Sequence, residues 1–211
     1  MTNLIIADAE VELIPEAIAL HPTVRASSRK RNRNPVECVL ESSLHYAAMR
    51  SLPDGGRRGR PDIAHLCLLL ALDSVPNRDG RLGIYLHTRG NYVMEFSPEV
   101  RLPKNYNRFV GLMEMALNSG SISSEQKELI HVSRERLPEL LKRIGGRNIL
   151  LTENSKPLKD YSVFQGSNII VGGFPQGEFI SDMNGLDCEE LSLYRSRLMA
   201  WTAVSMVLAR I

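Results

Sequence analysis

Residues 168–177 read NIIVGGFPQG, an apolar run that passes directly into a glycine-rich loop. Two similar runs flank it, NILLTE at 148–153 and ELSLY at 190–194, and each of them also leads into a loop. Short apolar runs bounded by loops indicate buried strands. Helical patterns alternate with such strands along the chain, and this alternation is typical of an α/β protein with a mainly parallel sheet. The sequence therefore predicts that fold class.

The remaining runs fit the same class. LIIAD at 4–8 predicts a further strand, and the tripeptide RGN between RLGIYLHT (81–88) and YVMEFS (92–97) predicts a β-hairpin. No internal repeat or low-complexity tract is present, so we predict a single domain over residues 1–211. Helices are expected at 11–20, 36–52, 63–73, 108–117, 136–145 and 198–211.

Composition excludes several protein classes. Apolar residues make up 43% and charged residues 24% of the 211 residues, which is ordinary for a globular protein and excludes wholesale disorder. No apolar run approaches the roughly 20 residues that cross a bilayer, and the N-terminus lacks a signal-like pattern, so we expect a soluble, cytoplasmic protein without membrane partners. The cysteines Cys38, Cys67 and Cys188 lie far apart, which argues against a disulfide scaffold or a cysteine zinc site.

The basic residues are clustered although the net charge is only +2. The windows RASSRKRNRN (25–34), GGRRGR (55–60) and RLPKNYNR (101–108) hold 11 of the 26 basic residues and no carboxylate. Such clusters are typical of a protein that binds a phosphate backbone, provided that the fold brings them onto one face; otherwise they are solvated surface. Residues 25–34 lack apolar periodicity, so we expect a loop or protruding arm there.

The glycine loop at 172–177 is the best candidate for a ligand loop. Glycines at the carboxyl end of a strand let backbone groups approach a flat or anionic ligand closely, although such a stretch is often only a turn. GGFPQG matches neither G-x-G-x-x-G nor G-x-x-x-x-G-K-[ST], so readings as a nicotinamide or nucleoside-triphosphate site lose support.

Two carboxylates are candidates for chemistry. Asp62 lies two residues after Arg60 and is predicted to orient that guanidinium for a phosphate, with a helix cap as the alternative. Asp73 ends the apolar run LCLLLAL and is a candidate base if it is partly desolvated; the alternative is a turn residue.

Other catalytic patterns are missing from the sequence. The five histidines show no metal-ligand spacing, and neither a G-x-S-x-G motif nor a paired cysteine and histidine is present. Hydrolase and metal-site readings therefore have no support. Trp201 forms a helical stripe with Leu198, Ser205 and Leu208, which we interpret as core or dimer contact.

GRPDI at 59–63 occurs together with RLP-x-N-Y-x-RF at 101–109, and this combination is highly specific. With the segments LGIYLHTRGNYV (82–93), IIVGGFPQG (169–177) and SLYRSRLMAW (192–201), the chain resembles the ribosomal-RNA pseudouridine N1-methyltransferases over nearly its whole length. This family belongs to the SPOUT superfamily, and the compact archaeal form is the most similar.

The resemblance implies a SPOUT fold whose C-terminal part, about residues 147–211, is threaded into a trefoil knot and binds the cofactor. It also implies S-adenosylmethionine as methyl donor, small-subunit ribosomal RNA as substrate and a homodimer, and it leaves contacts with small-subunit ribosomal proteins open. The cofactor-binding residues that it implies are Leu151, Thr152, Gly172, Gly173, Gly177, Leu191, Ser192, Leu193, Tyr194, Arg195 and Ser196.

The resemblance also assigns RNA contacts to Arg60, Arg101, Lys104 and Arg108, with Asp62 steadying an arginine. The family commonly has arginine where this chain has Lys104, and lysine lacks the planar fork of a bidentate phosphate contact. In the reaction that the resemblance implies, N1 of pseudouridine loses its proton and attacks the sulfonium methyl group, and Asp73 is the candidate proton acceptor. The alternatives are an assembly factor for which RNA binding is the essential task, and a SPOUT enzyme that acts on transfer RNA.

Overall fold

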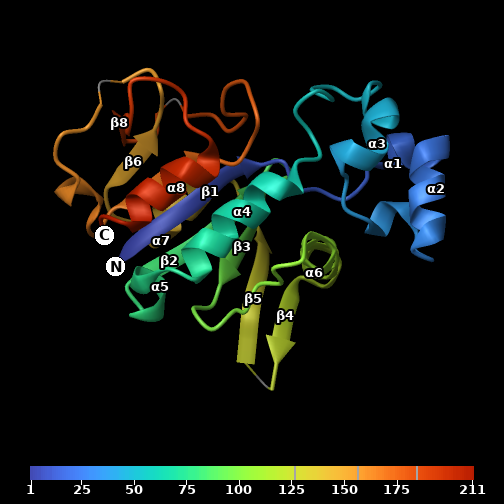
Figure 1. Ribbon diagram of the computed structural model, residues 1–211, viewed down its shortest axis with the longest axis horizontal. Helices are drawn as coiled ribbons and strands as arrows, with labels where there is room; N and C mark the ends of the chain where they lie inside the picture. The colour runs from blue at the N-terminus through green and yellow to red at the C-terminus, as the bar shows by residue number, and fades with distance from the viewer. Residues whose placement is uncertain (126, 156, 184) are drawn as a thin grey trace.

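Figure 1 shows the computed structural model, which describes residues 1–125, 127–155, 157–183 and 185–211. Its strands are β1 (Thr2–Ala9), β2 (Leu82–Thr88), β3 (Tyr92–Phe96), β4 (Ser121–Ser124), β5 (Lys127–Arg134), β6 (Asn148–Leu151), β7 (Asn168–Gly172) and β8 (Cys188–Leu191). Its helices are α1 (Glu16–Ala19), α2 (Pro22–Lys30), α3 (Ser42–Met49), α4 (Pro61–Leu72), α5 (Val75–Arg78), α6 (Tyr106–Ser119), α7 (Leu137–Ile144) and α8 (Ala200–Leu208), with 3-10 turns at Pro35–Glu37 and Ser162–Phe164.

All of these strands belong to one sheet, in the order β4-β5-β3-β2-β1-β7-β6-β8. In the part of the sheet with the order β2-β1-β7-β6-β8, all neighbouring strands are parallel. At the other edge β2 pairs antiparallel with β3, as the predicted hairpin requires, and β5 and β4 continue the antiparallel part. The α/β prediction is therefore confirmed, with an antiparallel extension at one edge.

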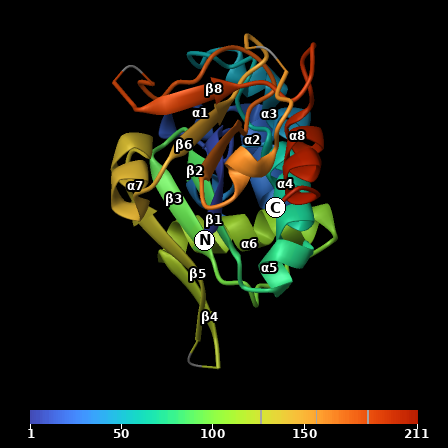
Figure 2. The same cartoon turned by 90° about the vertical axis from the view of Figure 1, so that its left-hand side faces the viewer.

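Helices cover both faces of the sheet (Figures 1 and 2). Leu4 and Ile6 of β1 face the cluster formed with α4, α6 and α8, whereas Ile5 and Ala7 face the cluster formed with α7. Successive side chains of a strand point to opposite faces, so burial on both sides explains why β1 is an unbroken apolar run. The helix pair α4 and α8 lies side by side across the front of Figure 1.

A small helical unit, α1 to α3, lies beside the sheet and has its own apolar cluster. The prediction of a loop or arm over 25–34 is wrong for residues 25–30, because they belong to α2. The His21 side chain accepts a hydrogen bond from the Thr23 backbone N–H at the start of this helix, and Val24 is buried beneath it. Arg31 then pairs with Glu114 of α6, which anchors the end of α2. One buried apolar residue is too weak a periodic signal to predict the helix from sequence.

Smaller differences concern element boundaries. Arg60 rather than Asp62 precedes α4 as its cap residue, and Asp62 lies in the first turn. The strand predicted at 190–194 is shifted to Cys188–Leu191, and the helix predicted at 36–52 is confined to a 3-10 turn and α3. Within the described ranges, no helix has the length and apolar character needed to cross a membrane.

Candidate functional site

A cavity of about 290 Å³ lies at the carboxyl ends of β6, β7 and β8. The loops that follow these adjacent parallel strands form its walls, together with the first turns of α4 and α8. Ligands of open α/β sheets bind at the carboxyl ends of the strands, and this volume is near the lower end of small-molecule sites. The three apolar runs that predicted the fold are therefore followed by the loops that form this cavity.

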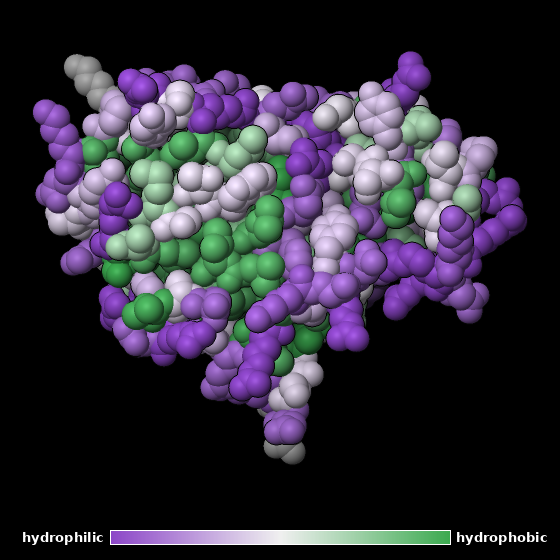
Figure 3. Space-filling model, in the orientation of Figure 1, coloured by the Kyte–Doolittle hydropathy of each residue, from purple (hydrophilic) through white to green (hydrophobic). Residues whose placement is uncertain are grey.

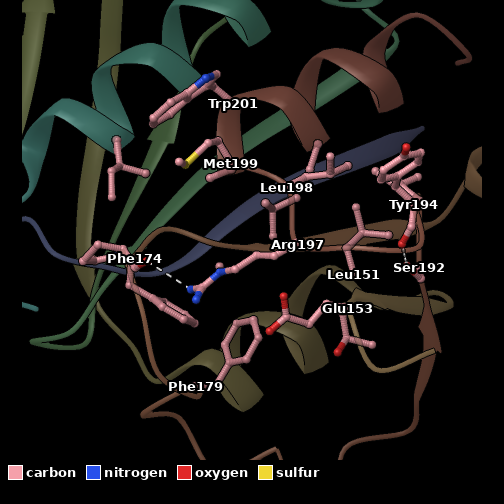
Figure 4. A pocket seen from close by; sticks show the side chains of 18 of the residues that line it. Leu151, Glu153, Phe174, Phe179, Ser192, Tyr194, Arg197, Leu198, Met199 and Trp201 are labelled. Atoms are coloured by element: carbon pink, nitrogen blue, oxygen red, sulfur yellow. Dashed lines mark hydrogen bonds between the residues drawn. The ribbon is translucent and has the colours of Figure 1, made fainter.

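The walls of the cavity combine aromatic and apolar side chains with a few polar ones. Figure 4 shows Trp201, Met199 and Leu198 at the start of α8 along one side, and Phe174 and Phe179 beyond Arg197. The carboxylate of Glu153 and the guanidinium of Arg197 also lie at the cavity. Flat apolar surfaces beside a few polar groups suit a ligand that carries both an aromatic ring and charged substituents.

Gly173 is required by the packing of the loop after β7 on β1, and Gly172 leaves room for the Phe174 ring. A Cβ atom at Gly172 would lie 2.8 Å from the Phe174 ring, and one at Gly173 would lie 2.8 Å from Ala9 Cβ. Gly172 lines the cavity, whereas Gly173 packs against β1 and donates its backbone N–H to Ala7 O (2.7 Å). The glycine pair therefore lets the loop lie close to both the ligand cavity and the sheet.

The loops are also tied to one another. Arg197 Nη2 donates a hydrogen bond to Pro175 O (3.0 Å), which joins the loop after β8 to the glycine loop (Figure 4). Thr152 N–H donates to Leu191 O (2.9 Å), which joins the loops after β6 and β8. These bonds make one continuous wall from three separate segments.

Asp8, at the end of β1, anchors the segment that follows Phe179. Its carboxylate accepts hydrogen bonds from the backbone N–H groups of Ile180 (2.6 Å) and Ser181 (2.9 Å) and from Ser181 Oγ (2.6 Å). Burial by itself raises the pKa of Asp8, but the hydrogen bonds of its carboxylate with His87 and Ser181 outweigh burial and hold that pKa below its ordinary value. Asp8 is thus an ionised, buried anchor of the cavity wall.

Most residues assigned to the cofactor loops line this cavity. Gly173, Leu191 and Arg195 do not, although Leu191 ties two of the loops together through its carbonyl. Those that do line it are Leu151, Thr152, Gly172, Gly177, Ser192, Leu193, Tyr194 and Ser196.

Sequence reasoning missed several residues of the wall. Trp201 packs against the main apolar cluster, as its interpretation as a core contact expects, and it also lines the cavity. Its place in the first turn of α8, directly after the third loop, was the signal that could have found it. Also missed were Glu153, Asn154, Glu178, Phe179 and Arg197.

Arg60 lines the same cavity from the start of α4 and is paired with Asp62. Arg60 Nε lies 2.9 Å from Asp62 Oδ1, and Arg60 Nη2 lies 2.7 Å from Asp62 Oδ2. The hydrogen bonds to Asp62 raise the pKa of Arg60, so the guanidinium is held charged and oriented beside the cavity. This geometry supports the orienting role predicted for Asp62 over the role of a helix cap.

The other arginines of the 55–60 window are less free than the sequence suggests. Arg57 pairs with Glu10, and Arg58 pairs with Glu12 through both of its carboxylate oxygens. These carboxylates come from the segment after β1, far away in the sequence. The window that looked like an uncompensated basic cluster is therefore largely neutralised by its neighbours.

Arg101 and Lys104 lie along α4 rather than at its first turn. They line a hollow together with Leu70 from the second half of α4 and Asp73 directly after it. His65 Nε2 lies 2.8 Å from Pro103 O and holds this segment against the helix. The structure thus brings these two cations onto one side of α4, whereas Arg108 lines neither hollow.

Asp73 is not desolvated, as a catalytic base would need to be. Its side chain is 80% exposed and pairs with Arg78. The hydrogen bond from Arg78 lowers the pKa of Asp73, whereas a base for this reaction needs a raised one. Asp73 also follows the end of a 12-residue helix that begins beside the cavity, about 18 Å away along its axis. The expectation of desolvation is therefore wrong.

The fold and cavity define an α/β protein that binds a small molecule at the carboxyl edge of its sheet. A model of the family described as EMG1/NEP1 methyltransferase matches residues 4–211. The chain belongs to this family of methyltransferases.

Named relatives are similar over nearly their full length. Ribosomal RNA small subunit methyltransferase Nep1 of Thermococcus kodakarensis is 44% identical, with 99% of this chain and 96% of that protein covered. The protein of the same name from Pyrococcus furiosus is 43% identical, with 98% and 94% covered. The crystal structure of Archaeoglobus fulgidus Nep1 bound to S-adenosylhomocysteine has a TM-score of 0.90 at 34% identity and covers 100% of this chain and 97% of that one.

Proposed function

We propose that this protein transfers a methyl group from S-adenosylmethionine to N1 of a pseudouridine in small-subunit ribosomal RNA. The observation that carries the proposal is the cavity built by the loops after β6, β7 and β8, in a chain that is similar throughout to an S-adenosylhomocysteine-bound relative. Family membership supports the reaction class, and the named relatives support the RNA substrate.

The residues of the cavity fit this cofactor. Phe174, Phe179 and Trp201 offer flat surfaces for an adenine ring, and the glycine loop leaves backbone groups accessible. The negative charge of Glu153 suits ribose hydroxyl groups or an amino group, and Arg197 suits a carboxylate. When bound, S-adenosylmethionine supplies an electrophilic methyl group on its sulfonium sulfur.

The chain contributes mainly orientation and electrostatics. Pseudouridine has an N1–H that uridine lacks; a bond forms from N1 to the methyl carbon, the carbon–sulfur bond breaks, and the N1 proton leaves to water. Arg60 beside the cavity stabilises negative charge on the base carbonyl groups, and Asp62 holds Arg60 in place. Holding N1 in line with the methyl group supplies most of the acceleration. We assign no base role to Asp73.

RNA is held along α4 in this proposal. Arg60, Arg101 and Lys104 flank that helix, and Arg108 lies in the first turn of α6. A target in a single-stranded loop can be turned out of its stack and reach the cavity. The exposed cations of α2 and of the turn after it (Arg25, Arg29, Lys30 and Arg33) extend the positive surface for the flanking phosphates.

The proposal includes a trefoil knot in the C-terminal part, about residues 147–211. The order of the strands supports it, because the chain runs from β6 inward to β7 and then outward past β6 to β8. The chain then returns as α8 to pack on α4.

We also propose a homodimer in the cytoplasm. Figure 3 shows apolar side chains gathered over α4 and α8, where Leu66, Leu70 and Met199 are exposed. An exposed apolar patch on two adjacent helices is typical of a subunit interface. Sedimentation velocity is expected to give twice the chain mass, and Leu66→Glu, on α4 outside the hollow of Arg101 and Lys104, is expected to shift it to one chain.

Methyl transfer from labelled S-adenosylmethionine to two matched ribosomal RNA hairpins tests the reaction. One hairpin carries pseudouridine at the target position and the other carries uridine. We expect label only in the pseudouridine hairpin; label in both would mean that N1 is not the acceptor.

An assembly factor whose methylation is dispensable is the second candidate, because the same arginines serve both tasks. Gly172→Val separates the two, since its side chain enters the cavity and clashes with Phe174. The variant is expected to lose methylation and keep its RNA affinity. If the variant supports ribosome assembly as well as the wild type does, the assembly-factor reading is favoured.

A further inference from the structure

Arg57 connects two loops that serve different ligands in the proposed function. It lies in the loop between α3 and α4, three residues before Arg60. Its guanidinium reaches the glycine loop, although Arg57 is not itself a residue of the cavity wall. This contact joins the segment that orients Arg60 to the segment that lines the cofactor cavity.

Arg57 contacts the glycine loop and the residue directly after it, Glu178, through a hydrogen bond and a cation–π contact. Arg57 Nη1 donates a hydrogen bond to Glu178 O (2.7 Å), and the guanidinium carbon lies 4.3 Å from the centre of the Phe174 ring. A Cβ atom at Gly177 would lie 3.2 Å from Arg57 Nη1, so the loop backbone is packed directly against the guanidinium. Phe174, Gly177 and Glu178 all line the cavity on their other side.

Glu10 holds the other side of the guanidinium. Arg57 Nε donates to Glu10 Oε1 (2.6 Å), and the Glu10 side chain is fully buried, with Arg89 as its second partner. The backbone of Glu10 repeats the connection, because its N–H donates to Gly173 O (3.3 Å) and its carbonyl accepts from Arg60 N–H (2.9 Å). Glu10 therefore connects the glycine loop to the start of α4 through its backbone as well as through its side chain.

We propose that Arg57 is a positioning residue that couples occupancy of the cofactor cavity to the RNA-binding geometry of Arg60. The inference rests on the proposed function, because it assigns the two coupled ligands. A ligand that orders Phe174 and Glu178 also fixes Arg57, and through Arg57 the loop that ends at Arg60. Coupling between two sites is reciprocal, so bound RNA raises the affinity for the cofactor by the same factor by which bound cofactor raises the affinity for RNA.

Arg58 provides a matched control. It is the next residue of the same loop and is also paired with a carboxylate, Glu12. Its third hydrogen bond goes to Pro53 O within its own loop, and within the described part of the chain no hydrogen bond or ion pair joins it to the glycine loop. Arg57→Lys and Arg58→Lys both keep the charge, remove the planar fork and disturb a carboxylate pair, but only Arg57→Lys removes a contact with the glycine loop and touches the pair with Glu10.

The test is a binding cycle on the full chain with S-adenosylhomocysteine and the pseudouridine hairpin. The affinity for each is measured by calorimetry with and without a saturating concentration of the other. We expect the wild type and Arg58→Lys to bind the hairpin about fivefold or more tighter when the cavity is occupied. Arg57→Lys is expected to bring this factor close to one while each ligand still binds.

An unchanged coupling factor in Arg57→Lys, or no coupling in the wild type, would overturn the inference and leave the proposed function standing. Failure of the wild type to bind S-adenosylhomocysteine would instead overturn the proposed function and the inference with it. Hydrogen exchange on the wild type tests the coupling even if the Arg57→Lys variant does not fold. S-adenosylhomocysteine is expected to slow exchange at residues 55–60, and unchanged exchange there would contradict the coupling.

Discussion

Arg60 and Asp62 face each other across the first turn of α4 in a bidentate pair, with Arg60 Nε 2.9 Å from Asp62 Oδ1 and Arg60 Nη2 2.7 Å from Asp62 Oδ2. Both side chains are partly exposed, so the pair adds little to the stability of the fold. Its effect is to fix the direction of a cation beside the cavity.

Asp62→Asn is therefore expected to impair function more than folding. The amide no longer accepts from both guanidinium nitrogens, so Arg60 samples other orientations, and kcat/KM for the RNA falls by about threefold to tenfold. Steady-state methylation of the hairpin measures this. Asp79→Asn, at an exposed pair with Arg81, is the control and leaves kcat/KM unchanged. Equal effects of the two substitutions would contradict the orienting role.

Asp73→Asn tests the carboxylate that the sequence suggested as a base. Because Asp73 is exposed and already holds a lowered pKa beside Arg78, its substitution is expected to leave the single-turnover rate within about twofold. The pH profile of the rate is expected to stay the same. A rate loss of a hundredfold would restore Asp73 as the proton acceptor.

Gly173→Ala tests the close packing of the glycine loop on β1. The added Cβ lies 2.8 Å from Ala9 Cβ and 2.9 Å from Ile6 Cγ2, so we expect a loss of about 1–3 kcal/mol in the free energy of unfolding. Gly111→Ala in α6 is the control, because nothing lies within 4 Å of its Cβ position. Alanine there is expected to stabilise the helix by about 0.5–1 kcal/mol. Urea unfolding of both variants measures the contrast.

Asp8 is expected to make the free energy of unfolding depend on pH in the acidic range. Its pKa is lowered in the folded state, so its stabilising contribution is fully present above the unfolded value and is lost as the pH falls through the folded pKa. Asp8→Asn is expected to lower the free energy of unfolding by about 2 kcal/mol at neutral pH, since charge-assisted hydrogen bonds to Ile180 and Ser181 are lost. Unfolding measured from pH 7 down to pH 3 should show the wild type and variant converging below about pH 4. A constant difference would contradict the ionised state of Asp8.

The cations of α2 and of the turn after it are expected to bind phosphates that flank the target. Replacing Arg25, Arg29 and Arg33 together by Gln should reduce the slope of log affinity against log salt by about 2, since each phosphate contact contributes roughly 0.7 for single-stranded RNA. Lys142→Gln, on α7 at the opposite face of the sheet, is the control and should leave the slope unchanged. If the triple variant has the wild-type slope, α2 lies outside the RNA surface.

Sequence reasoning succeeded where local pattern and burial agree. The runs that became β6 and β7 are apolar, bounded by loops and buried in the parallel half of the sheet, so their pattern alone identifies them. β4 and β5 were missed because their alternation is weak and polar, and their pairing depends on contacts with β3. α2 was missed because its stability comes from a capping bond and from Arg31, which pairs with Glu114 of α6.

The site divides in the same way. The glycine loop could be identified because glycine is needed locally, whereas Trp201 fits a buried helical stripe and its cavity face is visible only when the three loops come together. The partners of Arg57 and Arg58, Glu10 and Glu12, are far away in the sequence, so the charge of the 55–60 window could not be judged from the window itself.

A crystal structure of the chain with S-adenosylhomocysteine and the pseudouridine hairpin would test the proposed site and reaction together. We expect the cofactor between the loops after β6, β7 and β8, with N1 of the target base facing the sulfur atom and Arg60 beside a base carbonyl. A cofactor bound elsewhere, or a base whose N1 points away from the sulfur, would contradict it.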